Sequence, residues 1–93
     1  MTIKGYRQLD PETLELINKV KLHEEVLLTL VEEIRDHIRA QRANASLTGE
    51  QAKAELARLN LAEPERWAAM GRTDFQTGCM ALVRALAQPG ASK

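Results

Sequence analysis

The stretch RWAAMGRTDFQTGCMALVRAL, residues 66–86, decides the fold of this 93-residue chain. Within it, Phe75, Cys79, Leu82 and Leu86 follow one another at steps of four, three and four residues. This spacing places side chains on one stripe of an α-helix. The stretch therefore predicts a helix whose apolar side packs against another helix.

The remaining face of this helix is rich in hydrogen-bond donors. They are Arg66, Arg72, Thr73, Gln76 and Arg84. The carboxylates of Asp74 and Glu65 are the acidic groups nearby. Charged donors in such a group suit an anion, whereas a solvated helix face explains the same residues without any ligand. Both interpretations stay open at the level of the sequence.

A longer helix is predicted upstream, over residues 10–43. The run Asp10-Pro11-Glu12 is typical of a helix start, because Asp caps free amides and Pro fits the first helical position. Apart from a break at Glu24, an apolar seam follows at steps of three and four: Ile17, Val20, Leu27, Val31, Ile34 and Ile38. Further apolar residues fall off this seam: Leu16, Leu22, Val26, Leu28 and Leu30. An apolar arc this wide predicts self-association.

The segment between the two long helices predicts a connector helix over residues 48–60. Thr48 with Gln51 fits a capping box, and Asn60 is expected to close the helix. The residues expected to face inward are Ala52, Leu56 and Leu59. The Glu63-Pro64-Glu65 run then begins the second long helix, over residues 63–87, which Pro89-Gly90 ends.

These elements predict one all-α domain over residues 1–93. It is a long helical hairpin with a short N-terminal arm, residues 1–9, a short connector helix and a frayed tail, residues 88–93. A hairpin cannot bury so wide an apolar arc. Small domains that lack disulfides and metals are commonly stabilised by oligomerisation. We therefore expect a homo-oligomer.

Composition excludes several functional classes. Thirteen basic and thirteen acidic residues cancel, which argues against a DNA or RNA binder. Cys79 stands alone on an apolar stripe, so it is expected in the core and forms no intramolecular disulfide. His23 and His37 have no clustered partners, so no metal site is expected. The chain has no apolar run long enough for a membrane span and no export signal at its start, which predicts a cytoplasmic location.

Catalytic templates are also missing from the sequence. It contains no glycine-rich phosphate loop, HExxH, CxxC or GxSxG motif. The carboxylates in the pairs Glu24-Glu25 and Glu32-Glu33 are adjacent on a helix and point in different directions, which argues against a paired acid and base. We therefore predict a protein that binds a ligand and is not an enzyme, with no catalytic residue and no cofactor.

The N-terminal arm carries the only tyrosine of the chain. Tyr6 lies between Gly5 and Arg7, so it offers a stacking plane beside a cation, and Lys19 and Lys21 follow on the first helix. A ring that merely packs on a neighbouring helix is the alternative.

Several of these segments resemble a known family. They are GYRQL before the DPE helix start, LINKVK at 16–21, and RW followed by GRTDFQTG and MALVRALAQP. Residues 5–22 and 66–89 thus look like the phage anti-CBASS cyclic-oligonucleotide sponges, and the helical hairpin domain of an anti-Thoeris sponge family is similar. Residues 43–62 resemble no motif of the family.

The resemblance implies a function and a set of site residues. Its members are small homo-oligomers, hexamers in the best-known cases, that act in the cytoplasm of the infected host. They sequester cyclic dinucleotides, such as cyclic GMP-AMP, and cyclic trinucleotides without cleaving them, which blocks activation of CBASS effectors. By motif, Tyr6 and Lys21, with Arg7 beside them, match the dinucleotide site. The candidates for the trinucleotide site are Arg66, Arg72, Thr73 and Gln76.

A helical adaptor is the competing hypothesis. Such a protein would bind a protein partner through the wide apolar arc of the first helix, and helical periodicity alone does not distinguish it from a sponge. Tyr6 favours the sponge, because an aromatic ring beside Lys19 and Lys21 suits a nucleotide better than a protein partner.

Overall fold

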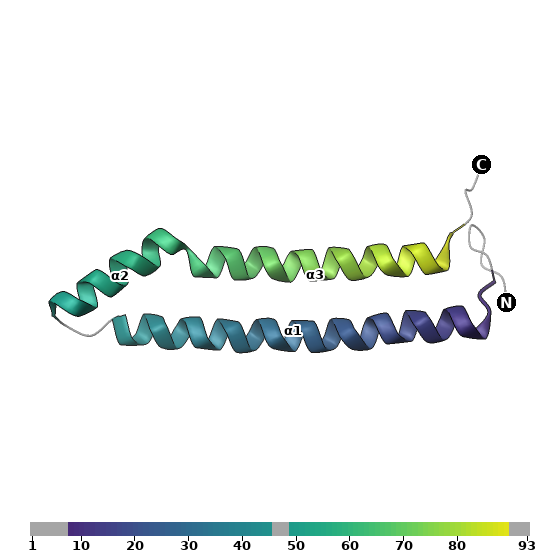
Figure 1. Cartoon of the computed structure of the whole chain (residues 1–93), viewed down its shortest axis with the longest axis horizontal. Coiled ribbons are helices and arrows are strands. Elements are labelled where there is room, and N and C mark those ends of the chain that lie inside the picture. The colour runs from purple at the N-terminus through teal and green to yellow at the C-terminus, as the bar shows by residue number, and fades with distance from the viewer. Residues whose placement is uncertain (1–7, 46–48, 90–93) are drawn as a thin grey trace. The chain divides into compact units, whose positions relative to one another are not determined.

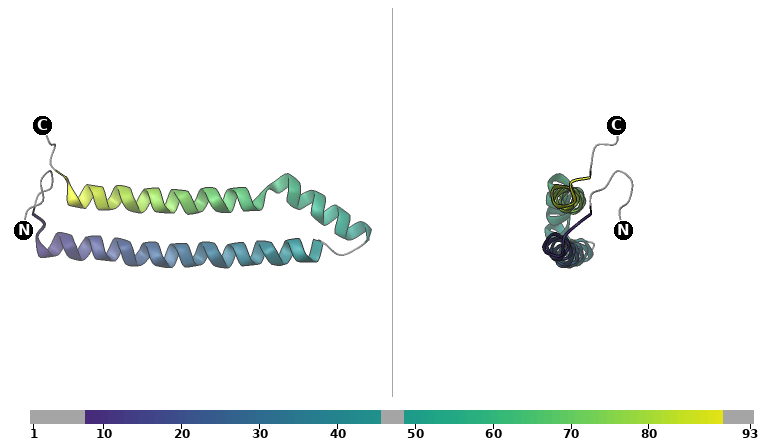
Figure 2. Two further views of the ribbon diagram at one scale, coloured as in Figure 1. Left: turned by 180° about the vertical axis from the view of Figure 1, so that it is seen from behind. Right: turned by 90° about the vertical axis from the view of Figure 1, so that its right-hand side faces the viewer.

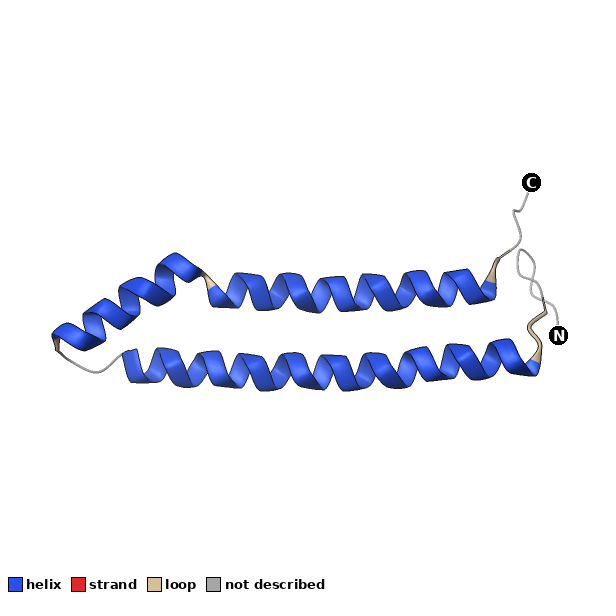
Figure 3. Cartoon of the chain, viewed as in Figure 1, coloured by secondary structure: helices blue, strands red, loops and turns tan. Residues whose placement is uncertain are grey.

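The computed structural model describes residues 8–45 and 49–89, which fold into helices joined by short segments (Figure 3). Helix α1 spans Pro11–Ala45, α2 spans Glu50–Ala62 and α3 spans Pro64–Ala87 (Figure 1). The prediction of an all-α hairpin is confirmed. None of these helices is long and apolar enough to cross a membrane, as far as the described residues go.

The start of α1 follows from its cap. The Asp10 carboxylate accepts a hydrogen bond from the Thr13 backbone N–H at 2.7 Å, and the Asp10 carbonyl accepts one from the Leu14 N–H at 3.1 Å. Pro11 then occupies the first helical position, where its missing N–H costs nothing. The helix continues to Ala45, two residues beyond the expected end, because the alanines near its end favour helix.

The bounds of α2 differ from the expectation at both ends. Its N-cap is Gly49, with φ 122° and no side-chain cap hydrogen bond, a backbone conformation that favours glycine. The expected cap Thr48 lies outside the described residues. The helix also runs past Asn60, because Glu63 takes the left-handed conformation (φ 51°, ψ 53°) and its N–H donates to the Leu59 carbonyl at 3.0 Å. Glu63 therefore caps α2, and α3 begins one residue later, at Pro64.

The chain divides into two compact units. The first unit contains Met1–Leu27 and Asp74–Lys93, and the second contains Leu28–Thr73. Within each unit, a part of α1 and a part of α3 lie side by side and run in opposite directions (Figures 1 and 2). The second unit also contains α2.

The core of the first unit lies between α1 and α3. Ile17 and Cys79 are buried, and Val20 and Val83 are half-buried. The expectation that Leu82 lies on the inward stripe is wrong, because its side chain is 57% exposed. A helix turns once in 3.6 residues, so the inward position after Cys79 can come three or four residues later, and the structure uses the fourth.

The second unit has its own core. Its buried residues are Val31, Ile38, Ala45 and Leu59. Two inward predictions fail here for the same periodic reason. Ile34 is 44% exposed while Arg35 is half-buried, and Leu56 is 41% exposed while Glu55 is half-buried. In both cases a charged residue, Arg35 or Glu55, lies at the edge of the core, and the aliphatic stem of Arg35 suits such a position.

The apolar residues outside the predicted seam of α1 stay mainly exposed. Leu22 and Val26 are 61% and 67% exposed, and Leu16 and Leu30 are 41% and 44% exposed. Leu28 is half-buried. The homo-oligomer inferred from this apolar surface stays a prediction.

An arginine at the end of α1 joins all three helices in the second unit. Arg42 donates from Nε and Nη2 to the two carboxylate oxygens of Glu65, at 2.7 and 2.9 Å, and from Nη1 to Asn60 Oδ1 at 2.7 Å. Bidentate pairing of this kind fixes geometry as well as charge. The hydrogen bonds from Arg42, with a backbone hydrogen bond, lower the pKa of Glu65 from its ordinary value near 4.5 to about 2.

We expect Glu65→Gln to lower the thermal unfolding midpoint at pH 7, because the variant loses the charged acceptor of Arg42. A carboxyl whose pKa is depressed on folding contributes stability above its unfolded pKa, and this contribution is lost as the pH falls through its folded pKa. The difference between wild type and variant should therefore be largest above about pH 4.5 and shrink toward about pH 2. Circular dichroism melts across this range measure it.

Glu32→Gln is the matched control. Glu32 pairs with Arg35 at 3.5 Å within one helix, and exposed pairs at this spacing contribute little. The control should shift the melt only slightly. A midpoint difference for Glu65→Gln that stays constant from pH 7 to pH 2 would contradict the assigned role.

Candidate functional site

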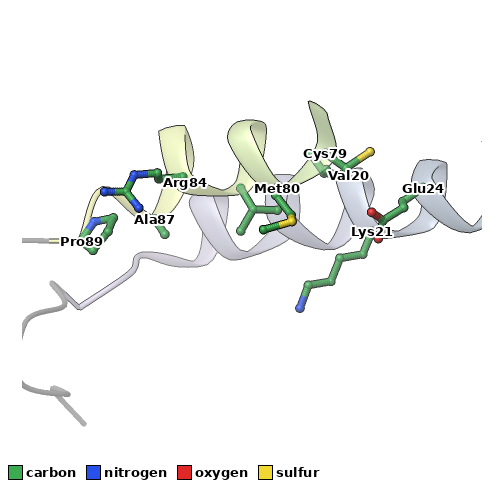
Figure 4. Close-up of a pocket in the computed structure, with 9 residues that line it drawn as sticks. Val20, Lys21, Glu24, Cys79, Met80, Arg84, Ala87 and Pro89 are labelled. Atoms are coloured by element: carbon green, nitrogen blue, oxygen red, sulfur yellow. The ribbon is translucent and has the colours of Figure 1, made fainter. Parts of the chain in front are cut away.

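A pocket of about 400 Å³ lies between α1 and α3 in the first unit (Figure 4). Helix α1 contributes Val20, Lys21 and Glu24. The C-terminal part of the chain contributes Cys79, Met80, Val83, Arg84, Ala87 and Pro89. The volume lies in the range of small-molecule sites, roughly 300 to 1,000 Å³.

Two cations line this pocket from opposite helices. Lys21 extends from α1 and Arg84 from α3, with Met80 between them in the view of Figure 4. Within residues 8–45 and 49–89, neither cation has an ion-pair partner, in contrast to Lys19, which pairs with Glu15 at 3.9 Å. Their charges therefore remain available to an anionic ligand.

The rest of the wall is apolar, except for Glu24. Met80 is 69% exposed, and Val20, Val83 and Pro89 are half-buried. An apolar wall with a few convergent charged groups is the usual composition of a ligand site. Cys79 also lines the pocket and is buried, which fits its expected role as a core residue.

The structure places one of the three residues predicted for the dinucleotide site. Lys21 lines the pocket, whereas Tyr6 and Arg7 lie outside the described residues. Neither Arg84 nor Glu24 is assigned to this site by the sequence: Arg84 is one of the donors of the second long helix, and Glu24 is a break in the seam and a member of the Glu24-Glu25 pair. An antiparallel pairing of the two long helices that sets residues near 20 beside residues near 80 would have indicated that Arg84 and Glu24 line the same site as Lys21.

The residues predicted for the trinucleotide site are divided between the units. Arg66, Arg72 and Thr73 belong to the second unit and Gln76 to the first, all on α3. The Arg66 guanidinium donates to Glu63 at 3.1 Å and lies 5.8 Å from the centre of the Trp67 ring. These contacts already occupy Arg66.

Arg72 differs from Arg66 in its burial and its ion pairing. It is half-buried and has no ion-pair partner in the described part of the chain. Thr73, next to it, is exposed. Arg72 is therefore the candidate cation of this set whose charge is available within one chain.

A second pocket of about 200 Å³ lies in the second unit and is lined by Arg35, Ile38, Arg39 and Glu65. Arg35 pairs with Glu32, Arg39 with Asp36 and Glu65 with Arg42. Because each charged group of this pocket already has a partner of opposite charge, it offers an anion less than the first pocket does.

Comparison with known proteins identifies relatives over most of the chain. Residues 1–87 match the family model of the Acb2/Tad1 hairpin domain. The chain is also similar to Anti-CBASS protein 2 of Pseudomonas phage JBD67, at 41% identity over 103 aligned residues. That alignment covers 94% of this chain and 91% of the phage protein. The helical hairpin described here therefore belongs to the Acb2/Tad1 hairpin-domain family.

Proposed function

We propose that this protein is a phage anti-CBASS protein that binds and sequesters cyclic oligonucleotide second messengers without cleaving them. The family and the name of the phage relative support this function. The observation that carries it is the pocket of the first unit, where Lys21 and Arg84 stand without ion-pair partners in the described part of the chain, beside an apolar wall.

The chemistry of a cyclic dinucleotide suits this pocket. The ligand has two phosphates and two flat bases. Lys21 and Arg84 would contact phosphate, and the surface formed by Val20, Met80 and Pro89 would cover a base. Tyr6 and Arg7 of the N-terminal arm would add a stacking ring and a third cation.

A symmetric interface would complete the site. Cyclic dinucleotides with two similar halves suit a site formed by two copies of the chain, because each contact is then made twice. This arrangement fits the exposed apolar residues of the first unit, such as Leu22 and Val26. Sequestration needs tight binding and slow release and requires no transition-state stabilisation.

A cyclic trinucleotide would bind separately, through the part of α3 in the second unit. Arg72 and Thr73 would contact the phosphates, with Arg66 as a further donor. Three copies around a threefold axis would present one such set to each phosphate. Arg66 would have to exchange its contact with Glu63 for the ligand.

We expect Lys21→Ala and Arg84→Ala each to weaken cyclic dinucleotide binding, because each removes one charge-assisted hydrogen bond to phosphate. The expected loss is about 1 to 3 kcal/mol, or roughly 5- to 150-fold in Kd, and a site that uses each residue twice would lose more. Tyr6→Ala should have a similar effect through lost stacking. Isothermal titration calorimetry measures the affinities, and intact ligand should be recovered after the protein is denatured.

Lys19→Ala is the matched control for this prediction. Lys19 lies two residues from Lys21 on the same helix, pairs with Glu15 and does not line the pocket. Its replacement should leave the affinity within about twofold of wild type. Unchanged binding in both Lys21→Ala and Arg84→Ala would exclude the pocket, and recovery of a cleaved ligand would exclude a sponge.

We expect the two ligand classes to bind at once. Saturating cyclic dinucleotide should leave trinucleotide affinity unchanged, and Arg72→Ala should weaken only the trinucleotide, by about 1 to 3 kcal/mol. Calorimetric titration of the preloaded protein measures this. Arg58→Ala is the control, because Arg58 is held by Glu55 on the same helix. Direct competition between the ligands would show one shared site.

We expect a homo-oligomer, a hexamer by analogy with the family, because a monomer would leave Leu22, Val26 and Met80 largely in water. Sedimentation equilibrium at micromolar concentration measures the mass. A stable helical monomer that binds no cyclic nucleotide would instead favour an adaptor, whose exposed α1 residues contact a protein partner.

A further inference from the structure

Glu24 is the single carboxylate that lines the pocket of the first unit, as far as the described residues show. It is half-buried, and it forms no hydrogen bond or ion pair within residues 8–45 and 49–89. Lys21 lies one helical turn away and does not pair with it. Figure 4 shows the Glu24 carboxylate on the α1 side of the pocket, close to the start of the Lys21 side chain.

A carboxylate at the position of Glu24 is unfavourable for two physical reasons. In a site for phosphate, a negative charge opposes the ligand, and at a half-buried seam position an apolar residue would pack better. If Lys21 and Arg84 face the phosphates of a cyclic dinucleotide, Glu24 is left to face another part of the ligand. The remaining polar groups of that ligand are its riboses and the edges of its bases.

We infer that Glu24 is a specificity-determining residue that accepts hydrogen bonds from guanine. This inference rests on the proposed function, since it names the ligand that the same pocket prefers. Guanine presents N1–H and the N2 amino group side by side, and the two oxygens of a carboxylate accept from such a pair of donors. Adenine presents one amino group beside the N1 lone pair, which repels a carboxylate oxygen.

The comparison that tests this is between cyclic di-GMP and cyclic di-AMP, which carry the same phosphates and riboses. We expect wild type to bind cyclic di-GMP at least about tenfold more tightly, the effect of one good charge-assisted contact. Glu24→Gln keeps the shape of the side chain and loses its charge. In this variant cyclic di-GMP should bind more weakly and cyclic di-AMP more tightly, so that the ratio falls to about threefold or less.

Two further variants sharpen the experiment. Glu25→Gln makes the same change at the neighbouring position, which does not line the pocket, and it should keep the wild-type preference. Glu24→Asp keeps the charge on a shorter side chain, and it should keep the sign of the preference at a smaller ratio. Circular dichroism of each variant verifies the helical fold before calorimetry.

The outcomes separate the inference from the function on which it rests. Tight binding of both ligands by wild type with equal affinity would overturn the role of Glu24 and leave the sponge function standing. A preference that survives in Glu24→Gln would do the same. If wild type binds neither cyclic dinucleotide, the proposed function fails and the inference fails with it.

Discussion

The structure depends on a narrow contact between two helices, because α1 and α3 can bury only the side chains that face each other. Six apolar residues are buried in the part of the chain described, and α2 supplies one of them, Leu59. A core this small provides limited hydrophobic stabilisation for a chain of 93 residues. The exposed apolar residues of α1 and α3 are the direct consequence, and they are the physical motive for the oligomer that we propose.

The second unit supplements its small core with polar contacts. Arg42 holds Asn60 and Glu65, so that the ends of α1 and α2 and the start of α3 meet at one guanidinium. The Glu63 backbone makes the turn between α2 and α3 in a conformation that usually favours glycine. The bidentate pair of Arg42 and Glu65 fixes the direction of the start of α3, where apolar packing is sparse.

Charge is distributed differently in the first unit. Its pocket gathers Lys21, Arg84 and Glu24 without pairing them, whereas Arg35, Arg39 and Arg42 in the second unit each have a carboxylate partner. Exposed charge without a partner in the described part of the chain lies here beside exposed apolar surface, and a ligand that carries both phosphates and flat bases would contact both. This contrast is why we place dinucleotide binding in the first unit rather than in the pocket beside Arg39.

The sequence by itself determined the helices, because caps and prolines act locally: Asp10 and Pro11 start α1, and Pro64 starts α3. Its motifs also indicated the family. Tertiary structure alone decided which of two adjacent residues faces inward, Val83 over Leu82, because a 3.6-residue turn leaves that choice to packing. It also decided the pairing of Arg42 with Glu65 and brought Arg84 to the pocket that Lys21 and Glu24 line, since residues this far apart in sequence become neighbours only when α3 packs against α1.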